Sequence, residues 1–310
     1  VAAASSGSYA IDTLRPTASV TLDKASLKAG ETATVTITFS EVVDDLADGD
    51  LIVVGSGALS ALTQDSGNGA VWTATFTPTA DIEDASTVVQ LTASGITDAA
   101  GNTGAGVVSS SNVDIDTLAP SASIALGKSA LKAGETTDVT VSFSEAVTGF
   151  DASADLSVTS DAGTLGSFTS TDGGLTYVGT FTASNSVSQT GNTITLANTG
   201  VADAAGNAGT GTTVSAAFDT DGVRPTVSSI VLSDTSLSAG ETTTVTITFS
   251  EAVSGLSVGD FSVEGGALTG LSTADSGTTW TATFTPTSDV EDGSNLITLA
   301  AESVLDAAGN

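Results

Sequence analysis

The acidic residues are the side chains in this sequence whose types and spacing could do chemistry. Asp and Glu number 36 against 6 Lys and Arg, and the formal net charge is -30. The sequence contains no His, Cys or Met, so imidazole and sulfur metal ligands are excluded and only hard, oxygen-bound cations such as calcium remain. The usual catalytic triads also need His or Cys. We therefore predict a cation-binding protein that is not an enzyme.

Three kinds of acidic position recur along the chain. The first is a glutamate that ends a TFSE or SFSE motif: Glu41, Glu145 and Glu251. The second is the aspartate that begins the motif DAAGN: Asp98, Asp203 and Asp306. The third is an aspartate four residues before a proline: Asp12, Asp116 and Asp221. Each kind returns roughly every 105 residues, and three independent markers at one interval indicate an internal repeat.

The markers divide the chain into three tandem repeats. We place repeat 1 at residues 15–116, repeat 2 at 117–221 and repeat 3 at 222–310. Residues 1–14 align with the last strand of a preceding repeat whose body is not in the sequence. Repeat 3 is expected to lack its own last strand.

The elements that must position the acidic residues are β-strands. In repeat 1, Val35, Ile37 and Phe39 alternate with threonines, which is the period of a strand with one buried face. No comparable stretch has a convincing helical period. Seven strands are predicted in this repeat, near residues 18–22, 33–39, 50–54, 57–63, 71–77, 87–93 and 107–115.

Seven short strands in about 100 residues favour a two-sheet sandwich of the immunoglobulin type. The antibody pattern of two cysteines and a tryptophan is missing, so Phe39, Trp72 and Phe76 are expected to fill the core instead. The predicted fold class is all-β: three tandem seven-stranded immunoglobulin-like β-sandwiches in an elongated rod.

The motifs AGET, TFSE, DAAGN and DTLAP, in units of about 104 residues, resemble the bacterial Ig-like tandem repeats of giant biofilm-associated surface adhesins. The resemblance covers nearly the whole chain. It implies export by type I secretion and an extracellular location at the bacterial cell surface. It also implies a role as an extender that holds an adhesive tip away from the cell, often with calcium at domain junctions.

Strand direction predicts where the acidic residues gather. If the strands of a sandwich alternate up and down, the strand that ends at Glu145 and the strand before Asp203 both reach the N-terminal pole of repeat 2. The last strand of repeat 1 brings Asp116 to the same pole. The calcium ligands predicted in this way for the three poles are Asp12, Glu41, Asp98 and Asn102; Asp114, Asp116, Glu145, Asp203 and Asn207; and Asp219, Asp221, Glu251, Asp306 and Asn310.

Crowded carboxylates favour a counterion. A pair of like charges at 4 Å repels by about 1 kcal/mol in water and about 4 kcal/mol at an intermediate dielectric, and calcium accepts six to eight oxygens in irregular geometry. The first site is expected to be poorer, because Ala10 stands where the other sites have Asp114 and Asp219. The alternative is that the Asp and Asn of DAAGN only brace a turn, in which Gly supplies a positive φ.

The predicted function is a structural extender of a bacterial surface adhesin or fibre, rigidified by calcium and supporting cell adhesion or biofilm formation. Short proline-containing links such as residues 116–120 favour stiff joints. The predicted partners are calcium and neighbouring Ig-like repeats of the same or another chain. Nucleic acid is excluded by charge, and membrane insertion by the lack of an apolar run of about 20 residues.

Two alternatives to a simple extender remain. One is a glycan- or receptor-binding module, because loops at sandwich poles often bind ligands. The other is a subunit that polymerises head to tail, in which residues Ala2–Ile11 of one chain complete repeat 3 of a neighbour by strand donation.

Overall fold

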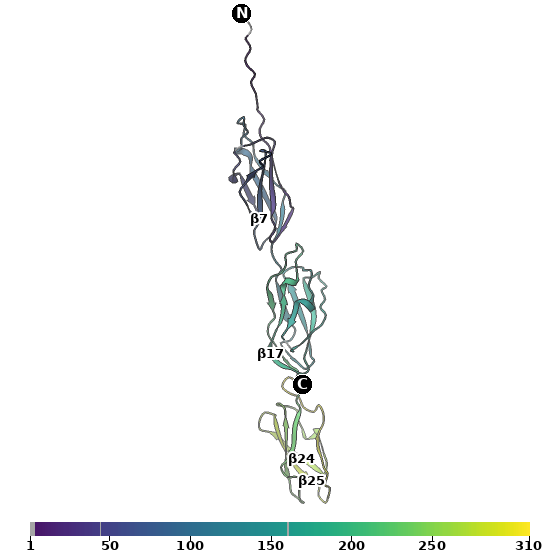
Figure 1. Ribbon diagram of the computed structural model, residues 1–310. Helices are drawn as coiled ribbons and strands as arrows, with labels where there is room; N and C mark the ends of the chain where they lie inside the picture. The colour runs from purple at the N-terminus through teal and green to yellow at the C-terminus, as the bar shows by residue number, and fades with distance from the viewer. Residues whose placement is uncertain (1–3, 44, 160) are drawn as a thin grey trace. The chain divides into compact units, whose positions relative to one another are not determined.

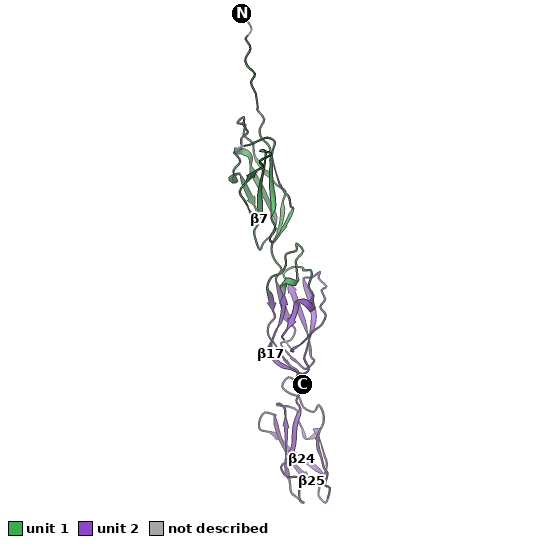
Figure 2. Ribbon diagram, viewed as in Figure 1, with its two compact units in different colours: residues 1–121, 143–150, 198–211 green, residues 122–142, 151–197, 212–310 purple. Residues whose placement is uncertain are grey.

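The structure is a computed structural model that describes residues 4–43, 45–159 and 161–310. The chain divides into two compact units (Figure 2). Unit 1 comprises residues 1–121, 143–150 and 198–211, and unit 2 comprises residues 122–142, 151–197 and 212–310. Unit 1 thus contains the first sandwich and two loops of repeat 2, while unit 2 contains the sheets of repeat 2 and all of repeat 3.

The prediction of an all-β fold with three immunoglobulin-like sandwiches is confirmed (Figure 1). In the described part of the chain the only α-helix is α1 (Ala152–Asp155). Single turns of 3-10 helix connect strands at η1 (Asp48–Asp50), η2 (Ala93–Gly95), η3 (Asn198–Gly200) and η4 (Val258–Asp260).

Repeat 1 consists of two sheets. The first has the order β1-β3-β7-β5, with β6 also paired to β7; its strands are β1 (Ala18–Leu22), β3 (Ala33–Phe39), β5 (Gly57–Leu59), β6 (Thr63–Gln64) and β7 (Val71–Pro78). The second has the order β2-β10-β8-β4, with β9 also paired to β8; its strands are β2 (Ser26–Lys28), β4 (Leu51–Val54), β8 (Glu83–Thr92), β9 (Val107–Ser109) and β10 (Val113–Asp116).

Repeat 2 follows the same plan, with its second sheet split in two. The first sheet runs β11-β13-β16-β15, with β11 (Ala122–Leu126), β13 (Thr136–Phe143), β15 (Gly163–Leu165) and β16 (Thr176–Ala183). The remaining strands pair as β12-β20-β17 and β14-β18-β19: β12 (Ala130–Lys132), β14 (Leu156–Val158), β17 (Ser188–Asn192), β18 (Ile194–Ala197), β19 (Thr212–Val214) and β20 (Phe218–Asp221).

Repeat 3 has a first sheet of the same order and a smaller second one. The first runs β21-β22-β25-β24, with β21 (Val227–Leu232), β22 (Thr243–Phe249), β24 (Gly266–Thr273) and β25 (Thr279–Pro286). The second is the pair β23 (Phe261–Val263) and β26 (Ile297–Leu299).

The alternation of Val, Ile and Phe with Thr builds each core. On β3 the apolar side chains of Val35, Ile37 and Phe39 are buried while Thr34 and Thr38 are exposed. Phe76 is fully buried beside them, and Trp72 is only partly buried at the edge of this core. Burying each large apolar side chain stabilises the sandwich by roughly 2–3 kcal/mol.

The structure adds strands that the sequence pattern did not predict. β2 is three residues long and pairs in parallel with β10, joining Leu27 to Ile115. β8 begins at Glu83, four residues before the strand predicted near residues 87–93. Residues 4–17 contain no strand, whereas the sequence predicted the last strand of a preceding repeat in residues 1–14; Val1, Ala2 and Ala3 lie outside the described residues.

Candidate metal centres

Three groups of carboxylates bring together the three recurrent acidic positions. The groups are Asp12, Glu41 and Asp98; Asp116, Glu145 and Asp203; and Asp221, Glu251 and Asp306. Within each group, one oxygen from every residue lies within 4.8 Å of the others. The structure therefore brings together all nine of the predicted aspartate and glutamate ligands at these positions.

The middle group shows how the elements position the side chains, and all of its residues belong to unit 1. Asp116 is the last residue of β10, and Glu145 follows β13 by two residues. Asp203 opens the DAAGN turn. A bridge between Thr148 and Ala202 holds the loop that carries Glu145 against that turn.

The DAAGN turn is braced by its own aspartate. Asp203 is only 3% exposed, and its Oδ1 accepts hydrogen bonds from the backbone N–H groups of Gly206 at 2.7 Å and Asn207 at 2.8 Å. Gly206 has a φ of 89°, in the left-handed region that Gly adopts without strain. The turn geometry expected from Asp and Gly is thus present at the same residue that joins the carboxylate group.

The asparagine of each turn, which the sequence analysis named as a calcium ligand, has its amide nitrogen bonded to the aspartates. The amide nitrogen of Asn207 donates to Asp203 Oδ2 at 2.7 Å and to the carbonyl oxygen of Asp116 at 2.9 Å. Its amide oxygen instead accepts the backbone N–H of Ala29 at 2.8 Å.

Asn310 repeats this arrangement. Its nitrogen donates to Asp306 and Asp221, and its oxygen accepts from Ala133 at 2.7 Å. Asn102 likewise donates to Asp98 Oδ2 at 2.8 Å and to the carbonyl oxygen of Asp12. These amides therefore hold the carboxylates in place, and in Asn207 and Asn310 the oxygen is already used.

Asp114 and Asp219, which the sequence analysis also named as ligands, are not members of the three carboxylate groups. Both are exposed, and Asp219 Oδ1 accepts the backbone N–H of Gly191 at 2.8 Å. Two residues along a strand span about 6.6 Å, which leaves each side chain one step short of the strand end. The expectation of a poorer first site because of Ala10 stays a prediction.

Sequence reasoning missed the lysines of the LKAGET motif. Lys28 Nζ donates to the carbonyl oxygen of Gly206 at 3.3 Å, and Lys132 Nζ donates to that of Gly309 at 3.3 Å. Each contact joins the LKA segment of one repeat to the DAAGN turn of the next. The sequence signal that could have revealed these contacts is the Lys-Ala pair that the LKAGET motif repeats at Lys28 and Lys132.

Burial and like charges raise the pKa of the glutamates. For Glu145 the largest cause is burial, followed by repulsion from Asp203, Asp116 and Glu83. Burial and neighbouring aspartates likewise raise the pKa of Glu41 and of Glu251.

In the first and third carboxylate groups, the pKa of one aspartate is lowered instead of raised. The side-chain hydrogen bond from Asn102 is the main cause that lowers the pKa of Asp98. At Asp306 burial is the largest influence and acts to raise the pKa, but the hydrogen bonds from Asn310 and the turn backbone together lower it. A cation would relieve the repulsion that these charged groups exert on the glutamates.

The geometry and chemistry of the groups fit calcium. Calcium binds oxygens at about 2.3–2.6 Å, so two oxygens on opposite sides of one ion are roughly 5 Å apart. A separation within 4.8 Å lets all three carboxylates reach a single ion. Asp116, Glu145 and Asp203 would hold it in the middle group, and their Asn and backbone partners would keep them oriented.

These features define a class of protein: tandem immunoglobulin-like sandwiches with carboxylate groups where one repeat meets the next. The family described as "Bacterial Ig-like domain" matches the chain three times, over residues 12–115, 116–220 and 221–310. The chain belongs to this family. No curated protein matches it.

Several solved structures are similar to the chain. FdeC, an Escherichia coli adhesin, is 17% identical with a TM-score of 0.33, and the match covers 92% of this chain and 96% of that one. Invasin, a bacterial integrin-binding protein, is 18% identical with a TM-score of 0.31, covering 88% of this chain and 55% of that one. InvD of Yersinia pseudotuberculosis is 12% identical with a TM-score of 0.31, covering 93% and 83%.

No helix in the described part of the chain combines the length and the apolar character that a membrane crossing requires.

Proposed function

We propose that the chain is a structural extender of a bacterial surface adhesin, in which calcium stiffens the joints between Ig-like repeats. In this proposal it acts outside the cell, supports adhesion or biofilm formation, and catalyses no reaction. Membership of the bacterial Ig-like family supports the general role. The rod shape, the export by type I secretion and the giant-adhesin class are parts of the same proposal.

One observation carries the calcium part of the proposal. Each carboxylate group combines an aspartate that precedes a sandwich with a glutamate and an aspartate from two loops of that sandwich. An ion bound to all three would tie the end of one repeat to the loops of the next. Such a tie restricts bending at the joint, because calcium binding is lost unless the three ligands stay together.

Calorimetric titration of the whole chain with calcium tests the site. We expect the original chain to bind calcium. The variant Asp116→Asn should weaken this binding and lower the number of calcium sites by one. The matched control is Asp114→Asn, which removes the same charge from an exposed position two residues away on the same strand. Equal effects of the two variants, or no heat with the original chain, would contradict the proposal.

Small-angle scattering tests the stiffening separately. The maximum dimension is expected to increase or to become better defined when calcium replaces a chelator. Asp116→Asn should reduce this response and Asp114→Asn should leave it intact. A maximum dimension that is the same in calcium and in chelator would contradict stiffening even if calcium binds.

A further inference from the structure

The second and third carboxylate groups, called here the Asp116 group and the Asp221 group, differ at one strand position. Asp116 ends β10 and Asp221 ends β20. Opposite Asp116 on the antiparallel neighbour is Glu83, the first residue of β8. Opposite Asp221 is Ser188, the first residue of β17. Side chains in such positions have Cβ atoms about 4.5–5.5 Å apart, so each neighbour can act on its aspartate.

The two neighbours act on their aspartates in opposite ways. Glu83 places a second negative charge opposite Asp116, and like charges in directly opposite positions destabilise a sheet. Its charge also reaches Glu145, whose pKa it helps to raise. Ser188 instead donates its hydroxyl to Asp221 Oδ1 and stabilises that carboxylate. The Asp116 group is therefore left with more uncompensated negative charge than the Asp221 group.

The contacts that hold the two DAAGN turns are otherwise alike. In both joints the lysine of the LKA segment donates to a carbonyl oxygen of the turn at 3.3 Å. The alanine after it donates its N–H to the asparagine side chain of the turn, at 2.8 Å in one joint and 2.7 Å in the other. That asparagine donates to the backbone carbonyl oxygen of Asp116 at 2.9 Å and of Asp221 at 3.0 Å. The pair Glu83 and Ser188 thus stands out against a shared background.

Each of these neighbours also lines an open hollow beside its group. A hollow of about 540 Å³ within unit 1 is lined by Glu83, Asp116 and the DAAGN turn of repeat 2. A hollow of about 480 Å³ within unit 2 is lined by Ser188, Asp221 and the DAAGN turn of repeat 3. A cation that approaches either group through its hollow therefore passes the residue at this position.

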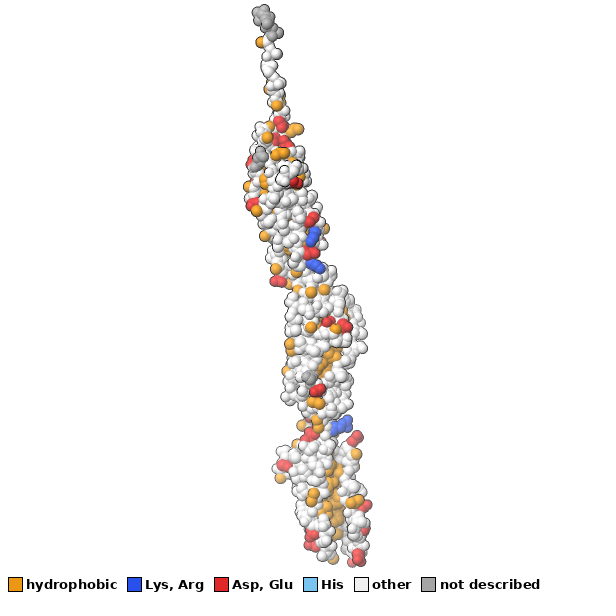
Figure 3. All heavy atoms as spheres, viewed as in Figure 1, with side chains coloured by type: hydrophobic (Ala, Val, Ile, Leu, Met, Phe, Trp, Pro, Cys, Tyr) orange, Lys and Arg blue, Asp and Glu red, His pale blue; other side chains and the backbone are white. Residues whose placement is uncertain are grey.

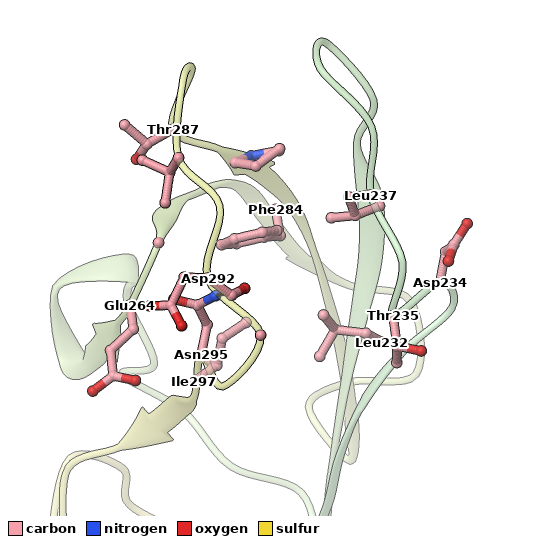
Figure 4. Close-up of a pocket in the computed structure, with 14 residues that line it drawn as sticks. Leu232, Asp234, Thr235, Leu237, Glu264, Phe284, Thr287, Asp292, Asn295 and Ile297 are labelled. Carbon is pink, nitrogen blue, oxygen red and sulfur yellow. Dashed lines mark hydrogen bonds between the residues drawn. The ribbon is translucent and has the colours of Figure 1, made fainter.

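Acidic side chains alone do not mark a site in this protein. On the face shown in Figure 3 they occur on all three repeats. Asp234, Glu264 and Asp292 line a pocket of about 400 Å³ in repeat 3, where Asp234 lies across the pocket from Glu264 (Figure 4). Within the described residues these three do not form a carboxylate group. What distinguishes Glu83 is its register opposite a member of such a group.

We propose that the residue opposite the strand-end aspartate sets the calcium affinity of each joint, so that Glu83 strengthens binding at the Asp116 group and Ser188 weakens it at the Asp221 group. This inference rests on the calcium sites of the proposed function. Glu83 is not one of the three grouped carboxylates and acts through its charge on the adjacent strand. Ser188 acts because calcium must compete with its hydroxyl for Asp221 Oδ1.

The consequence is that the two joints stiffen at different calcium concentrations. Ligand charge is one of the main determinants of calcium affinity, and we expect the Asp116 group to bind about tenfold more tightly than the Asp221 group. As calcium falls, the joint between repeats 2 and 3 therefore loosens first. The joint between repeats 1 and 2 remains tied over a further range of concentration.

Nuclear magnetic resonance of the whole chain, with calcium as the titrant, follows each joint separately. The amides of Gly206 and Gly309 lie in the two DAAGN turns and donate to Asp203 and Asp306, so each reports on one group. We expect the Gly206 signal to respond with a midpoint at about tenfold lower free calcium than the Gly309 signal.

Exchange of the two neighbours tests their role directly. Glu83→Ser should raise the calcium midpoint of Gly206 by about tenfold and leave that of Gly309 unchanged. Ser188→Glu should lower the midpoint of Gly309 by about tenfold and leave that of Gly206 unchanged. Equal midpoints in the original chain, or exchanges without effect, would overturn this inference while the calcium sites stand. Amides that do not respond to calcium at all would contradict the proposed function as well.

Two matched variants separate the position of the charge from the total charge. Glu83→Gln keeps the size of the side chain and should shift the Gly206 midpoint as Glu83→Ser does. Asp81→Asn removes the same charge from an exposed residue two positions earlier, at a φ of 55° that Asn tolerates, and should shift it much less. Equal shifts would indicate a general charge effect and overturn the inference.

Salt and a smaller substitution separate the two causes. Glu83 is exposed, so high salt should screen its charge and reduce the effect of Glu83→Gln. Ser188→Ala removes only the hydrogen bond to Asp221. It should lower the Gly309 midpoint by less than Ser188→Glu does, and this shift should persist in high salt. A higher Gly309 midpoint in Ser188→Ala would contradict the competition between the hydroxyl and calcium.

Melting in chelator tests the repulsion without any metal. Glu83→Ser removes a like charge opposite Asp116, so it should leave the melting temperature of the chain unchanged or raise it. A lower melting temperature would contradict the repulsion on which the inference depends.

Discussion

The Asp116 group and the Asp12 group contain the same three kinds of acidic position, but different contacts hold them in place. Asp116 ends β10, which pairs with β2. Lys28, the last residue of β2, and Ala29 after it contact the DAAGN turn of repeat 2. Asp12 lies in an exposed stretch without a strand, and in the described part of the chain Asn102 provides the hydrogen bond between its backbone and the turn. The difference teaches that the loops of one repeat supply two of the three carboxylates, while the second sheet of repeat 1 supplies Asp116 and further contacts that hold the group.

The largest expected effect comes from removing the aspartate of the turn. In calcium-free buffer Asp203→Ala should lower the free energy of unfolding of repeat 2 by about 2–3 kcal/mol, because Gly206 and Asn207 lose their acceptor. Hydrogen exchange of β13 and β16 during urea unfolding measures this repeat separately. Asp114→Ala is the control and should change stability by less than about 0.5 kcal/mol.

The same substitution in repeat 1 sharpens the comparison. Asp98 accepts equivalent hydrogen bonds from Ala100 and Asn102, so Asp98→Ala should cost as much as Asp203→Ala. A much smaller cost would show that the turn depends on the preceding repeat, and would contradict a local brace.

Calcium affinity should differ between the two groups by about tenfold, because the Asp116 group is held by more contacts before the ion binds. Calorimetry on Asp116→Asn should show loss of a tighter phase, and calorimetry on Asp12→Asn should show loss of a weaker one. If Asp12→Asn removed the tighter phase, the contacts of Lys28 and Ala29 would not preorganise the site.

The pH dependence should be smaller, because the glutamates remain partly exposed and water screens them. A raised pKa means that the folded state favours protonated Glu145. Without calcium its contribution to stability should therefore fall as pH rises from below 4.5 through the folded-state pKa. The lowered pKa of Asp98 acts oppositely, with its contribution lost as pH falls below 3.8.

Melting temperatures in chelator, with Glu145→Gln as the test variant, measure this effect. The variant should remove part of the decline between acidic and neutral pH. At neutral pH, calcium should restore the melting temperature that the original chain loses in chelator. This effect of calcium should weaken on acidification, because the ligands become protonated. A decline that Glu145→Gln leaves unaltered would show that other groups cause it.

The smallest effect should come from Lys28. Its contact with Gly206 is exposed, so Lys28→Ala should destabilise the turn of repeat 2 by about 0.5 kcal/mol. Hydrogen exchange of the Gly206 amide measures this. Lys24→Ala, which removes only the ion pair with Glu31, should leave that amide unchanged; an equal change would contradict the role of Lys28.

Much of the fold could be predicted because period-two alternation is a strong signal. The pattern around Val35, Ile37 and Phe39 gave the bounds of β3 as the structure has them. β2 could not be predicted, because three residues are too few to show a period. The start of β8 was missed because Glu83 and Asp84 suggest a loop, whereas hydrogen bonds from Ser86 lower the pKa of Asp84 to about 2 and keep it charged within the strand.

The candidate sites could be predicted as far as strand direction allows. Direction places Glu145 and Asp203 at the pole that Asp116 reaches. Strand direction cannot show which of two aspartates on one strand lies close to Glu145 and Asp203, so the prediction included Asp114 with Asp116. Nor does it show which end of an amide faces the group, and the orientation of Asn207 depends on Ala29 of another repeat.

The contact between LKA and DAAGN has a consequence for how such chains change in evolution. Lys28 and Lys132 meet turns of the same sequence in the following repeats. An in-frame duplication or deletion of one such repeat would therefore alter the length of the protein, and at each new boundary an LKA segment would still contact a DAAGN turn. Ser238 interrupts this interchangeability, because a module placed after repeat 3 would find a hydroxyl where its predecessors met an ammonium group.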